Sequence, residues 1–214
     1  LTGREGLALI NGTQVMAAIS ALNVLRAYRL FVLFDTAAAL SVEAVQASKK
    51  AFHPLIHNLR PHTGQRLVAN NIWKLIHDSD IQKNHQNCGK IQDAYSFRCI
   101  PQVHGSSREA YDIAKKIVET EINSVTDNPL FFSKEKMFLS GGNFHGQYLS
   151  QAMDFLSIGM ATMVNLSERR IEKLCDPKFS GHPPFLIKDT GLTSGLMAAH
   201  YTAAALASEN KTLA

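Results

Sequence analysis

Residues 13–50, TQVMAAISALNVLRAYRLFVLFDTAAALSVEAVQASKK, hold the longest helical pattern of the chain. Apolar residues cover nearly every side of this pattern as far as Phe34, and the turn dipeptide Asn11-Gly12 precedes it. A helix that is apolar on all sides is buried inside a protein. We therefore expect a helix from Thr13 to about Lys50, enclosed on every side.

The remaining sequence predicts shorter helices separated by irregular loops. Helical patterns cover Gln65 to Ile76, Ser106 to about Val125, His145 to about Lys173, and a last segment that Thr193 or Ser194 caps. Ser106 and Glu109 form a capping-box pattern, which predicts where the second of these helices starts. Aromatic and turn residues from Leu130 to Asn143 predict a small hairpin. We expect one all-α domain over residues 1–214, a bundle of long helices with irregular active-site loops.

Composition limits the partners and sites to be expected. The chain has 214 residues, of which 45% are apolar, enough for a sizeable core. Its net charge of +4 is spread evenly, so we expect no nucleic-acid partner. Polar residues at Asn11–Gln14 break the uncharged stretch Gly6–Leu25, so we expect no membrane span. Cys88, Cys99 and Cys175 are too far apart to form a disulfide framework, which favours a reducing cytoplasm.

The run Gln92-Asp93-Ala94-Tyr95-Ser96-Phe97-Arg98 carries the most distinctive chemistry. Gln92, Tyr95 and Arg98 recur at every third position, which places them on one face of a helix or tight turn. An arginine fork binds a carboxylate through two parallel hydrogen bonds, and a phenol can transfer a proton. The set suits a small acid held beside a proton-transfer group. The alternative is a loop with ordinary surface polar residues.

Three further loop segments contain residues suited to a site. Asn11 precedes Gly12 at the start of the long helix, where its amide can project into a cleft. The segment SGGNFHG, residues 140–146, displays Phe144 and His145 between glycines. Glu209 ends a stripe of small residues in the last helix, where we expect a partly buried carboxylate. The respective alternatives are a capped turn, a hairpin turn and a structural salt bridge.

Taken together, these segments resemble the aromatic amino-acid ammonia-lyases, and most closely the histidine ammonia-lyases among them. The matching segments, in the family's order, are Glu5–Thr13, Gln92–Cys99 with Pro101–Gly105, Thr126–Leu130, Ser140–Gly146, Ser167–Arg170 and Ser208–Lys211. Any one of them is weak, but six in order make coincidence very improbable. The resemblance implies an almost entirely helical fold and a homotetramer whose active sites each draw residues from three subunits.

The resemblance also implies a reaction, in which ammonia is eliminated from L-histidine to give trans-urocanate. Asn11 matches the asparagine beside a methylidene-imidazolone (MIO) ring, which the family makes autocatalytically from Ala-Ser-Gly. Gln92 and Tyr95 match residues that hydrogen-bond the substrate and this prosthetic group. Arg98 matches the arginine that binds the substrate carboxylate.

Three other positions bear on the substrate. By the same resemblance, Phe144 matches a phenylalanine packed against the MIO ring, and Glu209 matches a glutamate near the substrate side chain. His145 after Phe144 resembles the histidine-specific version of the motif. A carboxylate such as Glu209 suits an imidazole substrate because it can accept from a ring N–H. A phenylalanine or tyrosine ammonia-lyase, or an aminomutase, remains the alternative.

One departure from the family concerns the prosthetic group, because the chain contains no Ala-Ser-Gly. In the family this tripeptide precedes the Asn11 segment, as does a loop with the tyrosine usually assigned as base. We therefore expect residues 1–214 to be the central helical part of a longer enzyme. This part would lack the MIO-bearing N-terminal part and the C-terminal helices, and would be inactive alone.

Two readings of other kinds stay open. The chain could be a catalytically dead helical scaffold, although packing alone does not demand the polar set around Arg98. His53, His57 and His62 could in principle hold zinc, but Pro54 and Pro61 interrupt any helix that would align them. We therefore expect no metal.

Overall fold

The computed structural model describes residues 1–85 and 91–214; residues 86–90, which include Cys88, lie outside the described part. Helices dominate the described chain, which confirms the predicted fold class. The α-helices are α1 (Gly3–Ile10), α2 (Gln14–Ala44), α3 (Pro54–Asn58), α4 (Thr63–Ile76), α5 (Asp80–Asn84), α6 (Tyr95–Arg98), α7 (Ile100–Glu121), α8 (Gln147–Cys175), α9 (Pro177–Ser180) and α10 (Met197–Leu213). The 3₁₀ turns are η1 (Lys49–Phe52) and η2 (Pro184–Leu186). Strands β1 (Leu130–Phe132) and β2 (Met137–Leu139) pair antiparallel, which confirms the predicted hairpin.

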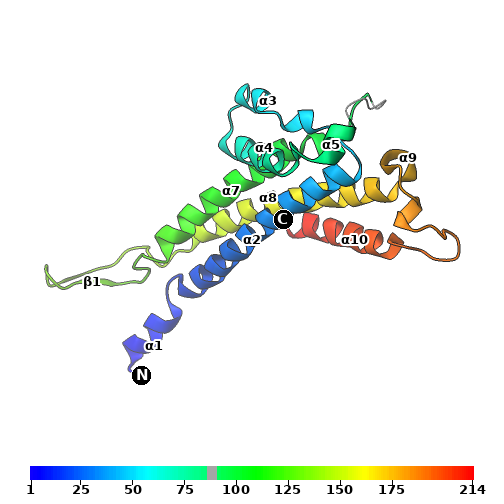
Figure 1. The fold of residues 1–214 in the computed structure, drawn as a ribbon. Coiled ribbons are helices and arrows are strands. Elements are labelled where there is room, and N and C mark those ends of the chain that lie inside the picture. Colours follow the sequence, from blue (N-terminus) through cyan, green and yellow to red (C-terminus); the bar gives the residue numbers. More distant parts are fainter. Residues whose placement is uncertain (86–90) are drawn as a thin grey trace.

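Helix α2 is the axis of the molecule, and α7 and α8 pack against it and against each other (Figure 1). Helix α10 lies on α8, while α4 contacts both α2 and α7. One hydrophobic core joins α2, α7 and α8 and includes Phe31, Tyr111 and Leu149. A second core joins the C-terminal half of α2 to α4 and α6 and includes Val42 and Phe97. The β1–β2 hairpin extends away from both cores.

Glycines allow the backbones of α4 and α7 to touch. A Cβ added at Gly64 would lie 2.1 Å from the Gly105 carbonyl oxygen, and one added at Gly105 would lie 2.4 Å from the Gln65 nitrogen. No side chain fits at either position without moving a backbone. The two glycines therefore fix how closely α4 approaches the first turns of α7.

Helix α7 begins at Ile100, not at Ser106, so the capping-box prediction was wrong. Pro101 lies in the first turn of α7, where its missing N–H leaves no helical hydrogen bond unmade. The Ser106 hydroxyl donates to a backbone carbonyl of the preceding turn at 3.0 Å. Glu109 accepts from the Gly64 backbone N–H at 2.9 Å, so this carboxylate caps α4 rather than its own helix.

The prediction that the long helix is buried on every side was also wrong. One stripe of α2 is buried, at Ala17, Ser20, Val24, Ala27, Phe31, Asp35, Ala38, Ala39, Ser41 and Val42. On the rest of the surface Val15 is 69% exposed, Leu25 63%, Leu33 62% and Leu40 67%. The cause is that α4, α7 and α8 cover one side, and within the described residues nothing covers these side chains. The helix also ends at Ala44 instead of near Lys50, where 3₁₀ turn η1 follows.

The stretch Gly3–Ala44 is long and apolar enough, by length and composition alone, to cross a membrane. The core helix of a globular protein meets the same criteria. In this stretch Asn11–Thr13 breaks the helix, and the buried Asp35 accepts hydrogen bonds from α4 and α7. These two polar features are typical of a core helix.

Removal of the Phe31 ring tests the core between α2, α7 and α8. Phe31 is fully buried and meets the Tyr111 ring edge-on, with 5.3 Å between centroids. We expect Phe31→Ala to lower the free energy of unfolding by about 3–5 kcal/mol because it leaves a cavity. Phe31→Leu retains most of the volume and should lower it less. Urea unfolding of both variants measures the difference, and equal losses would contradict the cavity explanation.

His57 makes stability depend on pH. Its Nε2 donates to the Ala51 carbonyl at 3.0 Å, and its Nδ1 accepts from the Gln65 amide at 3.0 Å, which requires the neutral ring. Burial lowers the pKa of His57 below its ordinary value. The unfolded chain therefore binds the proton first, and stability falls as the pH drops below about 6.5.

We expect this loss to be smaller in His57→Gln, which has no titrating ring. Unfolding free energies of both proteins at about pH 7 and about pH 5 measure the effect. An identical pH dependence in the two proteins would show that His57 contributes nothing to it.

Candidate functional site

Helix α6 presents Tyr95 and Arg98 on one side, as their spacing predicts. The Arg98 guanidinium lies over the Tyr95 ring, 4.5 Å from its centroid. Tyr95 is 69% exposed, whereas Phe97 points the other way, is fully buried and stacks on Phe179 at 5.5 Å. Gln92 is exposed and precedes the helix, so the shared helical face predicted for all three residues holds only for Tyr95 and Arg98.

Arg98 has no ion-pair partner anywhere in the described ranges. Its buried Nε also lacks an acceptor there. A guanidinium with unused donors binds a carboxylate through paired hydrogen bonds. Helix α6 therefore offers an anion-binding group beside a phenol.

Asn11 is fixed at the junction of α1 and α2. Its Nδ2 donates to Asp127 Oδ1 at 2.9 Å, and Arg4 donates to the other oxygen of Asp127 at 2.6 Å. Gly12 has φ of +104°, and a Cβ there would lie 1.9 Å from the Thr126 carbonyl oxygen. The Asn11 hydrogen bond is the main cause that holds the pKa of Asp127 below its usual range. The turn is thus locked onto the segment after α7.

Phe144 and His145 lie in the loop before α8. The Asn128 side-chain oxygen accepts from Gly141 N at 2.8 Å and from Ser140 Oγ at 3.0 Å, which anchors this loop. Phe144 is 41% exposed. His145 lines a cavity of about 690 Å³ between the end of α7 and the loop. Asn143, Glu121 and Lys116 share this lining with apolar side chains.

Glu209 is exposed on α10, so the expectation of a partly buried carboxylate was wrong. The buried carboxylate at the contact between α8 and α10 is Glu168 on α8, which pairs with Arg169 and lies 3.2 Å from His200 Nε2 on α10. Hydrogen bonds from Arg169 are the main cause that keeps the pKa of Glu168 below its usual value. The small-residue stripe that ends at Glu209 is exposed as well, and α10 packs on α8 through a different face, which includes His200 and the buried Ala207.

The sequence-predicted site residues do not meet within one chain. Asn11, Phe144 and His145 lie at the start of α2 and α8, while α6 packs in the core at the C-terminal end of α2. From Gln14 to Ala38, helix α2 rises about 36 Å. Helix α6, which carries Arg98, is therefore separated from Asn11 by most of the length of α2, the long helix that runs through the molecule in Figure 1.

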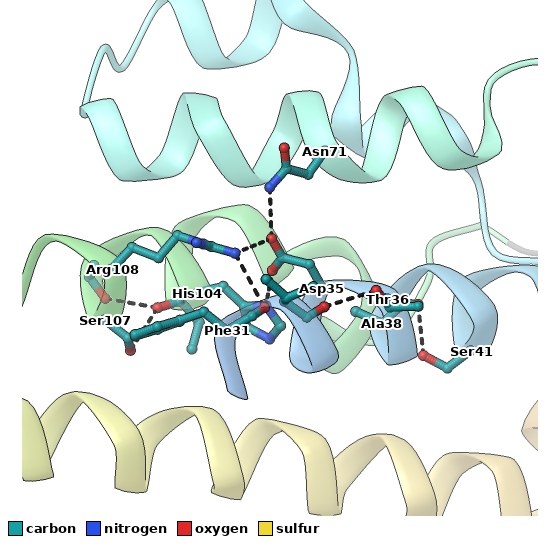
Figure 2. Close-up of polar contacts among 12 residues, drawn as sticks. Phe31, Asp35, Thr36, Ala38, Ser41, Asn71, His104, Ser107 and Arg108 are labelled. Carbon is teal, nitrogen blue, oxygen red and sulfur yellow. Dashed lines mark hydrogen bonds and ion pairs between the residues drawn. The ribbon is translucent and has the colours of Figure 1, made fainter. Parts of the chain in front are cut away.

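The sequence reasoning missed a buried polar cluster around Asp35 (Figure 2). Asp35 Oδ1 accepts from His104 Nδ1 at 3.0 Å. Asp35 Oδ2 accepts from Arg108 at 2.6 Å and from Asn71 at 2.9 Å. An acidic residue in an apolar helix, with His104 and Arg108 four residues apart, was the available signal.

The electrostatics of this cluster fix its charges. Burial by itself would raise the pKa of Asp35, but the hydrogen bonds from His104 and Asn71 and the charge of Arg108 hold it below its ordinary value. Burial lowers the pKa of His104, so its ring is neutral at pH 7. Asp35 and Arg108 therefore form an ion pair inside the molecule, and the buried Arg170, whose pKa burial lowers to about 10, adds a second guanidinium charge that acts on Asp35.

Two of the three histidines considered for zinc have structural roles. Both ring nitrogens of His57 are bonded to protein atoms. His53 caps α3 by accepting from Leu55 N at 3.3 Å, and its ring meets Trp73 edge-on. His62 precedes α4 and is exposed. These contacts use both ring nitrogens of His57 and one ring nitrogen of His53.

Known proteins match the chain throughout. A sequence model described as "Aromatic amino acid lyase" matches residues 1–214. A histidine ammonia-lyase of Myxococcus xanthus is 46% identical over 213 residues, which cover 100% of this chain and 42% of that protein. The chain therefore spans about two fifths of the length of this curated relative.

Solved structures agree with the sequence matches. The histidine ammonia-lyase of Trypanosoma cruzi is 49% identical with a TM-score of 0.88, over 99% of this chain and 39% of that one. The phenylalanine aminomutase of Pantoea agglomerans is 37% identical with a TM-score of 0.91, over 99% of this chain and 45% of that one.

The role of Asp127 in holding α1 can be tested by hydrogen exchange. Helix α1 has no buried residue, and Arg4 and Asn11 connect it to Asp127. We expect Asp127→Ala to speed exchange of the amides in residues 3–10, because both connections are lost. Glu135→Ala, in the exposed hairpin turn, is the control and should leave α1 unchanged. Unchanged exchange in Asp127→Ala would mean that other contacts hold the helix.

Proposed function

The chain belongs to the aromatic amino acid lyase family, and we propose that the protein containing it eliminates ammonia from L-histidine to give trans-urocanate. The higher identity to histidine ammonia-lyases, 49% against 37% for the aminomutase, supports histidine as the substrate. We expect no turnover from these 214 residues without the remainder of the enzyme, since they contain no Ala-Ser-Gly.

The observation that carries the proposal is the arrangement of Arg98 and Tyr95. Arg98 stacks on the Tyr95 ring at 4.5 Å and has no ion-pair partner in the described part of the chain. Its fork would bind the α-carboxylate of the amino acid. A fixed carboxylate holds the β-proton at a defined place, which the elimination requires. The adjacent phenol of Tyr95 would donate a hydrogen bond to the bound substrate.

The remaining site residues take supporting roles in this proposal. Gln92 would hydrogen-bond the substrate from the segment before α6. Glu209, which is exposed in the chain, would accept from the imidazole N–H of histidine. His145 lines the cavity beside α7 and would contact the substrate side chain.

The residues at the start of α2 fit the family's prosthetic group. The Asn11 side-chain nitrogen donates to Asp127 at 2.9 Å, which leaves the side-chain oxygen of Asn11 to accept a hydrogen bond. Phe144 presents a half-exposed ring on an anchored loop. These two side chains would hold and pack the MIO ring. When bound, that ring supplies the electron sink for the elimination, while this chain supplies the carboxylate fork at Arg98.

A homotetramer with shared active sites is part of the proposal. Arg98 and Asn11 lie at opposite ends of α2, and exposed apolar side chains such as Leu25 and Leu33 run between them. Monomeric proteins rarely leave such a surface open to water. Packing of α2 against other copies would cover these residues and bring the two halves of a site together.

The experiment uses the full-length protein, incubated separately with L-histidine, L-phenylalanine and L-tyrosine. We expect product absorbance from L-histidine only. Arg98→Ala should lower kcat/KM by about 100-fold or more, because a charge-assisted pair is lost. Arg98→Lys retains the positive charge but cannot form the paired hydrogen bonds of a guanidinium. Its kcat/KM should therefore lie between those of the wild-type enzyme and Arg98→Ala.

The outcomes separate the alternatives. Product from L-phenylalanine or L-tyrosine would favour the related lyase or aminomutase activity, as in the Pantoea agglomerans neighbour. No product from any substrate would favour a catalytically inactive scaffold. Full activity of Arg98→Ala would show that Arg98 does not bind the substrate.

A further inference from the structure

We propose that Asp35 is a positioning residue for the carboxylate-binding group: its buried carboxylate fixes the first turns of α7, and through them α6, so that Arg98 meets the substrate. This inference rests on the proposed function, because it assigns Arg98 the substrate carboxylate. Asp35 itself is buried and does not contact the substrate in this proposal.

Helix α6 continues directly into α7. Cys99 is at once the last cap of α6 and the first cap of α7. Its N–H donates to the Tyr95 carbonyl at 2.9 Å, and its own carbonyl accepts from Val103 N at 3.1 Å. No linker separates the two helices, so the place of Arg98 follows that of the start of α7.

The start of α7 is anchored to α2 by Asp35. His104 is fully buried, and its Nδ1 donates to Asp35 at 3.0 Å from the second turn of α7. Arg108, one turn later on the same side, donates to the other oxygen at 2.6 Å. Two donors four residues apart fix the rotation of α7 about its own axis as well as its distance from α2. Rotation matters because it sets the direction in which Tyr95 and Arg98 point.

The Arg98 side chain has no polar anchor of its own within residues 1–85 and 91–214. Its contact with Tyr95 lies within the same short helix, so it moves with that helix. A substrate-binding guanidinium must keep its donors unused until the ligand arrives, so its direction has to come from the backbone. The opposite face of α6 is held by Phe97, which fixes depth in the core.

The choice of a charge at position 35 supports this role. Burying a carboxylate is unfavourable, and apolar residues of similar volume often stabilise a core equally well. A directional network specifies one geometry, which apolar packing specifies less tightly. The Asp35 network therefore specifies the geometry of this junction more tightly than apolar packing would.

The test compares two probes that compete with substrate in the full-length enzyme: imidazolepropionate, which has a carboxylate, and 4-methylimidazole, which lacks one. In Asp35→Asn we expect the inhibition constant of imidazolepropionate to rise about tenfold or more. That of 4-methylimidazole should stay within about twofold. His104→Gln is the second variant, in case Asp35→Asn does not fold, and should show the same selectivity.

Asn71→Ala is the matched control, because Asn71 donates to the same carboxylate from α4 and leaves both α7 donors in place. It should lower stability without changing the ratio of the two inhibition constants. Equal weakening of both probes in Asp35→Asn, or no weakening of either, would overturn the proposal.

A measurement without ligand keeps this test independent of the proposed function. The amides of Arg98 and Cys99 should exchange faster in Asp35→Asn than in Asn71→Ala, because α6 loses its anchor only in the former. Equal exchange in the two variants would overturn the positioning role, whatever the enzyme acts on. Failure of the wild-type enzyme to convert L-histidine would instead contradict the proposed function and leave this comparison valid.

Discussion

The arrangement of the helices depends on one buried carboxylate. Asp35 sits inside α2 and accepts hydrogen bonds from two side chains of α7 and one of α4 (Figure 2). An unpaired charge there would be strongly unfavourable, so each donor must arrive in its place for the core to close. The close backbone contact between Gly64 and Gly105 fixes the distance between α4 and α7 at the same junction. Direction and distance between α2, α4 and α7 are thus specified together.

Much of this fold could be predicted from the sequence, because helices and the hairpin depend on local periodicity. The pattern around Leu130–Phe132 predicted the hairpin, and the pattern from His145 predicted α8. The start of α7 was missed because Ser106 and Glu109 satisfy a local capping rule, while tertiary contacts use them otherwise. A local rule cannot state that Glu109 caps a different helix.

Burial was predicted less well, and α2 shows why. Apolar residues on every side of a helix indicate that burial of each side is favourable. They do not indicate which element, or which other chain, packs against each side. Within the described residues Phe31 is buried by α7 and α8, whereas Leu33, two positions along, is 62% exposed. Glu209 is the converse case: it is exposed, and Glu168 on the adjacent helix is the buried carboxylate. Both outcomes depend on neighbours that the local sequence does not encode.

The same helix explains why the predicted site residues do not meet within one chain. Arg98 lies on α6, which packs through Phe97 in the core at the C-terminal end of α2, whereas Asn11 lies in the turn at the N-terminal end, and α2 rises about 36 Å between these regions. An amino acid is far shorter than that, and bending α2 to close the gap would separate both hydrophobic cores. Two copies packed antiparallel along their exposed α2 faces would instead place the N-terminal end of one beside the α6 of the other. The apolar side chains that are exposed in one chain, such as Leu25 and Leu33, lie where such packing would cover them. Such packing would account both for the exposed face of α2 and for the separation of Asn11 from Arg98.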